Sequence, residues 1–208
     1  MSDPDWLEWA REVQAIAQTG LAFNPNQYDR ERYEALQALA ARMMAARSDS
    51  LATRVENLFG AQTGYATPKV DVRGAAFDGT RLLLVREVSD GGRWTLPGGW
   101  ADVNLTAEEN IVREVAEESG FQVKVTKLAA VWDRTRQGHT PQPFSAYKLF
   151  FLCAITGGAA AVSHETSEVA FFAEDELPAD LSTERVTAAQ LRRMFEHARS
   201  PELPTEYD

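Results

Sequence analysis

The chain has 208 residues, of which 21 are Lys or Arg and 31 are Asp or Glu, so its formal net charge is −10. This length suits one domain with an appendage or two small domains, and contents of 44% hydrophobic and 25% charged residues exclude disordered and collagen-like classes. The acidic balance argues against nucleic-acid binding, which needs a basic surface to displace counterions from phosphates. An acidic protein that handles phosphates therefore needs local arginines or a bridging metal ion.

The N-terminal residues and the cysteine content indicate a compartment. The apolar runs, such as residues 149–155, are much shorter than the roughly 20 residues of a membrane helix, so no membrane contact is expected. The N-terminus is acidic and lacks the basic start and apolar middle of a signal peptide. Cys153 is the single cysteine, lies in an apolar run and is expected to pack in the core. These features predict a cytoplasmic protein.

The first helix is predicted from its cap and from the spacing of its apolar residues. Asp3 is expected to cap this helix with Pro4 at its first position, and Gly20 is expected to end it. The expected apolar face is formed by Trp6, Trp9, Ala10, Val13, Ile16 and Ala17.

Two further helices are predicted between the first helix and residue 63. One is expected over residues 28–47 and a short one over residues 51–58. We therefore expect residues 1–62 to form a helical extension of a domain that spans residues 63–208. An extension of this size is too small to hold a large core alone, so its apolar face must pack on the following domain or on a second copy of the chain.

Residues 63–208 mix strands with helices. Apolar and β-branched runs bounded by turns predict strands at residues 69–75, 81–86, 94–96, 123–132, 146–155 and 168–172. Helices are predicted at residues 106–119 and 188–199. Thr106 and Glu109 have the spacing of a capping box, and Gly120 is the expected stop of that helix. This order predicts a domain of the α+β or α/β class with a mixed sheet.

Three carboxylates share one face of the helix predicted before Gly120. At about 100° per residue, Glu117 and Glu118 lie about 60° to one side and 40° to the other side of Glu114. Like charges this close repel, whereas clustered carboxylate oxygens suit Mg²⁺, which also binds substrate phosphates and waters. The glycine pair that ends at Gly99 would let a backbone carbonyl approach the same ion. The pattern therefore predicts a metal site rather than a solvated acidic face.

This block resembles the Nudix box, in which a glycine, a glutamate, an Arg-Glu pair, a Glu-Glu pair and a second glycine recur at fixed spacing. The residues that match in register are Gly99, Arg113, Glu114, Val115, Glu117, Glu118, Gly120 and Phe121. Leu105 departs from the pattern, because it takes the place of the first glutamate, which in the family helps hold the loop to the helix through the box arginine. We therefore expect another carboxylate to pair with that arginine, from Asp102, Glu108 or Glu109.

The resemblance implies a fold, a reaction and a cofactor. The implied fold is α+β, the Nudix α/β/α sandwich with a mixed sheet, here preceded by the N-terminal helical extension. The implied reaction is hydrolysis of a nucleoside diphosphate linked to a moiety X, with Mg²⁺ or Mn²⁺ as cofactor. The implied metal ligands are Glu114, Glu117, Glu118 and the carbonyl of Gly99, and the implied structural residues of the box are Arg113 and Gly120. The implied general base is one of Glu118, Glu165 and Glu168.

Candidate substrate contacts come from side chains whose chemistry suits phosphates or bases. Arg86 and Arg134 suit bidentate bonding to phosphate, although a solvated surface charge is the alternative. Trp132 is a candidate for stacking on a base, with packing in the core as the alternative. His139 lies in a polar loop at residues 133–141, which is either a substrate loop or a plain hairpin connection.

The N-terminal helices resemble those of a Nudix subgroup that includes hydrolases of CDP-choline and ADP-ribose. This resemblance implies a homodimer with the extension at the interface; an intramolecular lid is the alternative. We expect a small-molecule nucleotide diphosphate substrate of the ADP-ribose or CDP-choline type. A non-catalytic nucleotide-sensing regulatory domain is the second hypothesis, and an RNA 5′-end pyrophosphohydrolase is the third, which the net charge of −10 disfavours.

Overall fold

The structure, a computed structural model, describes residues 4–23, 25–46 and 59–208. The chain divides into two compact units, of which one combines Lys69–Thr140 with Ala146–Asp208. The other combines the residues that precede Lys69 with Pro141–Ser145. No helix within the described ranges is long and apolar enough to cross a membrane. We call the first the sheet unit and the second the helical unit.

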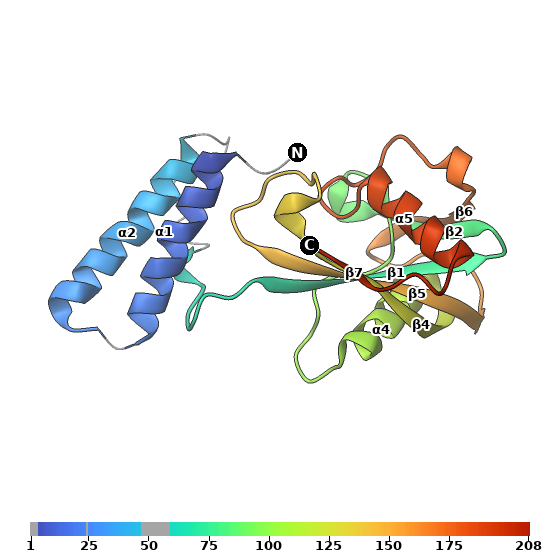
Figure 1. Cartoon of the computed structure of the whole chain (residues 1–208), viewed down its shortest axis with the longest axis horizontal. Coiled ribbons are helices and arrows are strands. Elements are labelled where there is room, and N and C mark those ends of the chain that lie inside the picture. Colours follow the sequence, from blue (N-terminus) through green and yellow to red (C-terminus); the bar gives the residue numbers. More distant parts are fainter. Residues whose placement is uncertain (1–3, 24, 47–58) are drawn as a thin grey trace. The chain divides into compact units, whose positions relative to one another are not determined.

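The helical unit is built on two helices that lie side by side (Figure 1). They are α1 (Asp5–Ala22) and α2 (Gln27–Ala45), and the side chain of Asn26 caps α2 by accepting a hydrogen bond from the backbone N–H of Asp29. The core of the unit is formed by Leu7, Ala10, Ala40, Ala41, Met44 and Phe59. The short helix expected at residues 51–58 lies outside the described residues.

Two expectations about α1 are wrong. Gly20 does not end the helix but lies inside it, because α1 continues to Ala22. The position needs glycine for a different reason, since a Cβ atom there would collide with the ring of Tyr33 on α2. Pro4 takes the N-cap position rather than the first helical position, and no side chain caps the helix there. The cap expected from Asp3 lies outside the described residues.

The sheet unit contains a mixed sheet of seven strands, as far as the structure describes it. The strands are β1 (Lys69–Asp78), β2 (Arg81–Glu87), β3 (Arg93–Thr95), β4 (Phe121–Asp133), β5 (Ala146–Gly158), β6 (Thr166–Phe172) and β7 (Glu206–Tyr207). Their order is β3-β2-β1-β5-β4-β7, and β6 also pairs with β2. Because β1 and β5 are parallel whereas β4 and β5 are antiparallel, the expected mixed sheet is confirmed.

Two helices cover the opposite faces of this sheet, α4 (Ala107–Ser119) and α5 (Ala188–Arg199) (Figure 1). Successive residues of a strand point to opposite faces, so Phe150 packs in the core layer of α5 while Phe151 packs in that of α4. Cys153 lies buried in the α4 layer, which confirms its expected place in the core. The unit is thus an α+β sandwich with an α/β/α arrangement.

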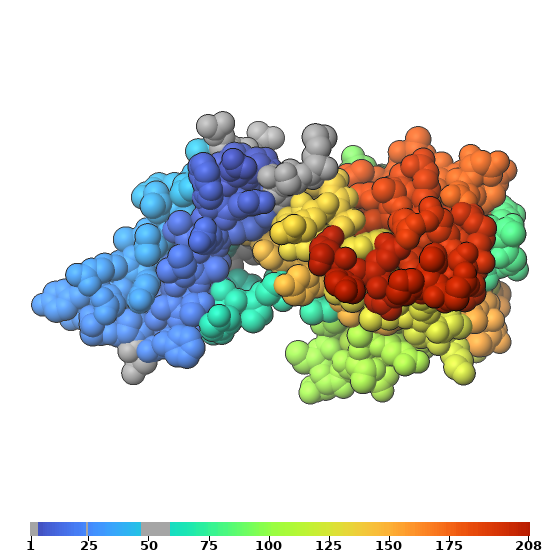
Figure 2. Space-filling view, viewed as in Figure 1, coloured from blue at the N-terminus to red at the C-terminus, as the bar shows by residue number. Residues whose placement is uncertain are grey.

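The C-terminal segment completes the sheet unit in a way that the sequence did not predict. The two residues of β7 pair with β4. Because β7 is so short, it produces no periodic pattern in the sequence. Beyond β7, the side chain of Gln137 donates to the carboxylate of Asp208 over 2.6 Å. Figure 2 accordingly shows the C-terminal residues (red) beside the segment that follows β4 (yellow). The C-terminal residues therefore support the loop between β4 and β5.

Candidate active site

Both ends of α4 form as the sequence predicts. The hydroxyl of Thr106 accepts from the backbone N–H of Glu109 at 3.1 Å, and the carboxylate of Glu109 accepts from the backbone N–H of Thr106 at 2.8 Å. At the other end Gly120 adopts a left-handed conformation with φ of 78° and terminates the helix. These two ends fix which face of α4 meets the loop that precedes it.

The loop before α4 is hydrogen-bonded to the first half of β1. The backbone N–H of Gly74 donates to the carbonyl of Pro97 at 2.9 Å, and that of Val72 donates to the carbonyl of Gly99 at 2.8 Å. Gly98 lies between them with φ of 136°, and a Cβ atom there would collide with the carbonyl oxygen of Val72. Only glycine therefore allows this approach. The carbonyl of Gly99, a predicted metal ligand, already accepts one hydrogen bond and retains one lone pair.

The three glutamates of the box have different surroundings. Glu118 is only 4% exposed, and its Oε2 accepts a hydrogen bond from the backbone N–H of Gly98 at 2.9 Å. Glu114 is partly buried and accepts from the Nη2 of Arg113 at 2.9 Å. Glu117 is exposed. The deepest carboxylate is therefore fixed to the glycine loop, whereas the other two lie nearer to solvent.

Burial and like charges make the protonated form of these acids more favourable. The pKa of Glu118 is raised to about 8, mainly by burial and also by the negative charges of Glu114 and Glu87, although Arg73 and the N–H of Gly98 oppose this shift. The pKa of Glu114 is raised as well, first by burial and then, against the effect of Arg113, by neighbouring acids that include Glu165. The site therefore concentrates negative charge that a cation would relieve.

A divalent cation fits the chemistry of this donor set. Carboxylate and carbonyl oxygens are the ligands that hard cations prefer. Within the described residues, however, no group of three or more His, Cys, Asp or Glu side chains lies close enough to hold an ion as it stands. Each buried carboxylate has its own donor instead, Arg113 for Glu114 and Gly98 for Glu118. The predicted ligands therefore lie in one region, but their side chains do not form a complete coordination site.

The loop between Gly99 and α4 is anchored although Leu105 replaces the usual glutamate. Arg113 pairs with Asp102 at 2.7 Å, which selects one of the three carboxylates proposed from the sequence, and Glu109 serves the capping box instead. Asn110, fully buried, adds a second anchor: its Oδ1 accepts from the backbone N–H of Asp102 at 2.8 Å. Sequence reasoning missed Asn110, because an asparagine inside a helix has no characteristic spacing.

A buried charged network lies beside the glycine loop on the α5 face of the sheet. Arg73 donates to both carboxylate oxygens of Asp71, at 2.8 and 2.7 Å, and also to the carbonyl of Leu96 at 3.2 Å. Lys148, only 1% exposed, donates to Asp71 at 2.7 Å. Two cations therefore share one carboxylate, and Arg73 also acts electrostatically on Glu118. Sequence reasoning missed Asp71 and Arg73, although polar residues on the inward face of a strand were a signal.

Two of the predicted substrate residues lie close to this network. Arg134 is buried and donates to the carbonyl of Thr140 at 2.6 Å. His139 is 6% exposed, and its Nδ1 lies 3.0 Å from the carbonyl oxygen of Thr183. The charges of Lys148 and Arg134 both act on His139. The connection between β4 and β5 is therefore a hairpin that also carries buried polar side chains.

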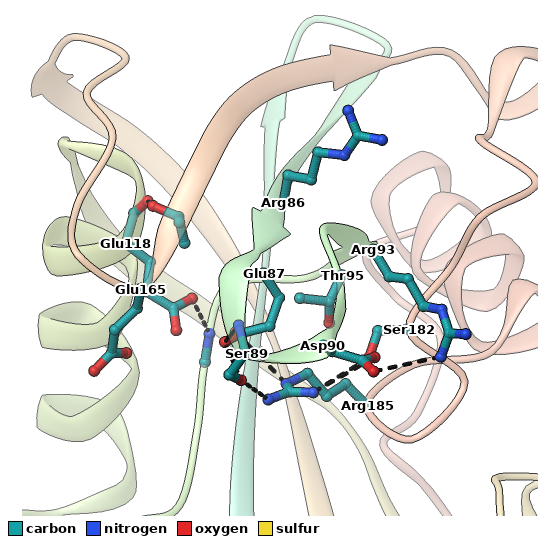
Figure 3. Close-up of polar contacts among 12 residues, drawn as sticks. Arg86, Glu87, Ser89, Asp90, Arg93, Thr95, Glu118, Glu165, Ser182 and Arg185 are labelled. Atoms are coloured by element: carbon teal, nitrogen blue, oxygen red, sulfur yellow. Dashed lines mark hydrogen bonds and ion pairs between the residues drawn. The ribbon is translucent and has the colours of Figure 1, made fainter.

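The other sequence-based candidates are scattered. Arg86 pairs with Glu168 and with Asp180, each at 3.2 Å. In Figure 3 the side chain of Arg86 points away from Glu118. Glu165 is half exposed and acts electrostatically on Glu114. Trp132 is buried and packs on the ring of Phe150 in the α5 core layer, which agrees with the packing alternative.

A second cluster of polar side chains lines the region near Glu118 (Figure 3). Arg185 lies 3.6 Å from the carboxylates of Glu87 and Asp90, and it donates to the hydroxyl of Ser89 at 3.0 Å. The hydroxyl of Ser182 donates to Asp90 at 2.6 Å. The cluster joins the turn after β2 to the segment before α5. Its partners are so distant in sequence that no local pattern predicts them.

Two family models match the chain. The model described as the NUDIX domain matches residues 67–194, so the chain belongs to the Nudix hydrolase family. Members of this family generally use divalent metal ions. The second model, described as a UDP-X-like N-terminal oligomerisation domain, matches residues 4–59. The protein is therefore a Nudix protein with an N-terminal helical region of the oligomerisation type.

Three similar proteins match this chain over nearly all of their own length. A Bacillus subtilis protein with the provisional name ADP-ribose pyrophosphatase YjhB is 45% identical over 203 residues, which cover 98% of this chain and 97% of that protein. A crystal structure of a UDP-X diphosphatase is 33% identical, covers 100% of both chains and has a TM-score of 0.62. An ADP-ribose pyrophosphatase from Streptococcus suis is 37% identical with a TM-score of 0.62, and the match covers 68% of this chain and 100% of that one.

Proposed function

We propose that this protein hydrolyses the diphosphate of a nucleoside diphosphate linked to a second moiety, of the ADP-ribose, CDP-choline or UDP-sugar type. The observation that carries the proposal is the position of Glu118, which is buried at the end of α4 against the N–H of Gly98. Relatives that match nearly the whole chain are named as an ADP-ribose pyrophosphatase and a UDP-X diphosphatase, which supports the same substrate class.

We assign the metal site to the acidic face of α4. The residues that would hold Mg²⁺ or Mn²⁺ are Glu114, Glu117, Glu118 and the carbonyl of Gly99. When bound, such an ion neutralises diphosphate oxygens and lowers the pKa of the attacking water. Arg113 supports this face by holding the loop through Asp102.

A carboxylate must take the proton of the attacking water. Of the three candidates, Glu118 lies deepest and Glu165 acts electrostatically on Glu114, so both belong to the acidic region. Glu168 instead pairs with Arg86. We therefore favour Glu118 or Glu165 as the general base over Glu168.

The experiment that tests the proposal is a panel of nucleoside diphosphate derivatives, assayed with Mg²⁺, with Mn²⁺ and with a chelator. The panel includes ADP-ribose, CDP-choline and UDP-glucose, and the products are identified by mass. We expect release of a nucleoside monophosphate and the phosphorylated second moiety, and loss of this activity with the chelator. Tight nucleotide binding without cleavage of any compound would instead indicate the nucleotide-sensing alternative.

We also propose that the protein is a homodimer assembled through its helical unit. The match to an oligomerisation domain over residues 4–59 supports assembly. The exposed side chains of Trp9 and Ile16 lie seven residues apart on α1, and the exposed Phe23 follows directly after the helix, so the three form one apolar stripe along α1. We assign this stripe to contact with a second copy of the chain. The alternative is a lid that acts within one chain.

A further inference from the structure

His139 is held in one orientation by the segment before α5. Its Nδ1 lies 3.0 Å from the carbonyl oxygen of Thr183. A carbonyl oxygen only accepts hydrogen bonds, so Nδ1 carries the proton. Thr140 strengthens this junction, because its hydroxyl lies 3.1 Å from the hydroxyl of Thr183. The ring is therefore fixed between the loop after β4 and the segment before α5.

The second ring nitrogen of His139 has no partner. Nε2 is buried and makes no hydrogen bond within the described part of the chain. Burial, followed by the charge of Lys148, lowers the pKa of His139 to about 3, so the ring is neutral at ordinary pH. Arg134 acts in the same direction, whereas Asp71 and the bond to Thr183 act against it. With the proton on Nδ1, a neutral ring presents Nε2 as an acceptor.

The position of this acceptor links it to the catalytic region. Lys148, which acts on His139, is bonded to Asp71, and Asp71 is bonded to Arg73. Arg73 in turn donates to the carbonyl of Leu96, just before the glycine loop that holds Glu118. Buried hydrogen bonds therefore join Lys148 to the residue at the start of the glycine loop, and His139 is coupled to this network through the charge of Lys148.

A buried acceptor without a donor is unfavourable, so such a group is usually satisfied by a ligand or by a water with several polar partners. The cations beside His139 suit the anionic part of a substrate, but the ionised diphosphate itself only accepts hydrogen bonds. The group that satisfies Nε2 must carry a proton to donate, such as a sugar hydroxyl or the amino group of a base.

We propose that Nε2 of His139 accepts a hydrogen bond from a hydroxyl or amino group in the nucleoside or X portion of the substrate, which makes His139 a specificity-determining residue. This inference rests on the proposed function and deepens it. It assigns to His139 the recognition of a donor group next to the diphosphate, rather than contact with the phosphates.

The first test compares substrates with and without candidate donor groups. Wild-type protein and a His139→Asn variant are assayed on ADP-ribose, CDP-choline and UDP-glucose, and on their 2′-deoxy and 3′-deoxy counterparts and base analogues that lack the amino group. Asparagine can still donate to Thr183 but places no acceptor at the position of Nε2. We expect kcat/KM of the variant to fall about 10- to 100-fold on substrates with the recognised donor. On the analogue that lacks this donor, kcat/KM should be the same for the wild type and the variant.

A second test uses binding to the wild-type protein and does not depend on the variant. The ¹⁵N resonance of Nε2 is followed in histidine-labelled protein during titration with the non-hydrolysable α,β-methylene analogue of the panel compound that binds most tightly. An upfield shift of Nε2 at saturation, with Nδ1 still protonated, is expected. Equal losses on every analogue together with an unmoved Nε2 signal would overturn the proposal and indicate that only water occupies the position.

The two tests separate this inference from the proposed function. Cleavage of the panel with an unmoved Nε2 signal refutes the role of His139 alone. A shifted Nε2 signal without cleavage refutes hydrolysis but supports recognition. Absence of both cleavage and a shift refutes both proposals.

Discussion

Glu118 combines a buried carboxylate with a fixed hydrogen bond to the glycine loop, so its replacement tests the site most directly. We predict that Glu118→Gln lowers kcat by at least about two orders of magnitude, because it removes the proposed metal ligand and candidate base. The matched control is Glu168→Gln, which removes an exposed carboxylate of β6 paired with Arg86 and should retain most activity. Steady-state kinetics of both variants test this prediction, and circular dichroism checks that both variants fold. Wild-type rates for Glu118→Gln would contradict the assignment.

Asp71 compensates two buried cations, which makes it a residue of high structural importance. Although burial alone would raise its pKa, the charges of Arg73 and Lys148 lower it to about 2. We predict that Asp71→Asn lowers the free energy of unfolding by about 3–5 kcal/mol, because it leaves both cations buried without a carboxylate. Lys148→Met removes one of the cations and should cost less. Urea denaturation of the two variants measures the difference, and an equal or smaller loss for Asp71→Asn would count against the network.

The neutral state of His139 predicts a pH dependence of stability. Its pKa in the folded protein is lowered to about 3 from a usual value of 6.5, mainly by burial. As the pH falls below 6.5, the unfolded chain binds a proton at this position that the folded protein does not, so this contribution to stability is lost on acidification. Between pH 7 and pH 5 the free energy of unfolding of the wild type should fall by about 2 kcal/mol relative to His139→Asn. A difference that stays constant with pH, measured by urea denaturation, would show that the pKa of His139 is the same in the folded protein as in the unfolded chain.

At the scale of elements, the close approach of the glycine loop to β1 sets the position of Glu118. Gly98 and Gly79 both have positive φ, of 136° and 59°, but only at Gly98 would a Cβ atom meet another group, the carbonyl of Val72. We predict that Gly98→Ala displaces the loop, lowers stability by more than about 2 kcal/mol and reduces kcat. Gly79→Ala should lower stability by only about 1 kcal/mol and leave kcat unchanged. Thermal unfolding and steady-state kinetics of the two variants test this. Equal changes of stability and kcat in both variants would show that the positive φ alone, and not the contact with Val72, causes the effect.

The elements also show why helix ends differ in how well they can be predicted. The capping box of Thr106 and Glu109 lies within four consecutive residues, so sequence reasoning located the start of α4. Gly20 was interpreted as a helix end from its residue type, yet its role is to make room for Tyr33 of α2. That contact joins two helices and depends on how they pack, which no local pattern contains.

At the scale of the whole molecule, the exposed stripe on α1 predicts how the chain assembles. We predict that the wild type is a homodimer in solution and that Trp9→Glu combined with Ile16→Glu gives a monomer, because charges replace apolar side chains that a partner would cover. Val162→Glu, which alters an exposed apolar side chain of the sheet unit, is the control and should remain dimeric. Light scattering with size-exclusion chromatography over a range of concentrations measures the mass. A wild type that is monomeric throughout would favour the lid alternative.

The sequence by itself determined the features that are encoded within short segments. These include the box helix with both its ends, the strands of the sheet other than β7, and the Nudix assignment through Arg113, Glu114, Glu117 and Glu118. The physical reason is that caps, periodicity and turns arise from interactions among residues a few positions apart. The roles of the individual site residues remain predictions.

Only the tertiary structure decided which distant side chains meet. Lys148 reaches Asp71 because β1 and β5 are parallel neighbours in register, although 77 positions separate these residues in the sequence. The contact of His139 with Thr183 and the choice of Asp102 as the partner of Arg113 depend in the same way on how loops fold back. Such contacts are set by strand register and by the packing of whole elements, so the sequence supplies their chemistry but not their pairing.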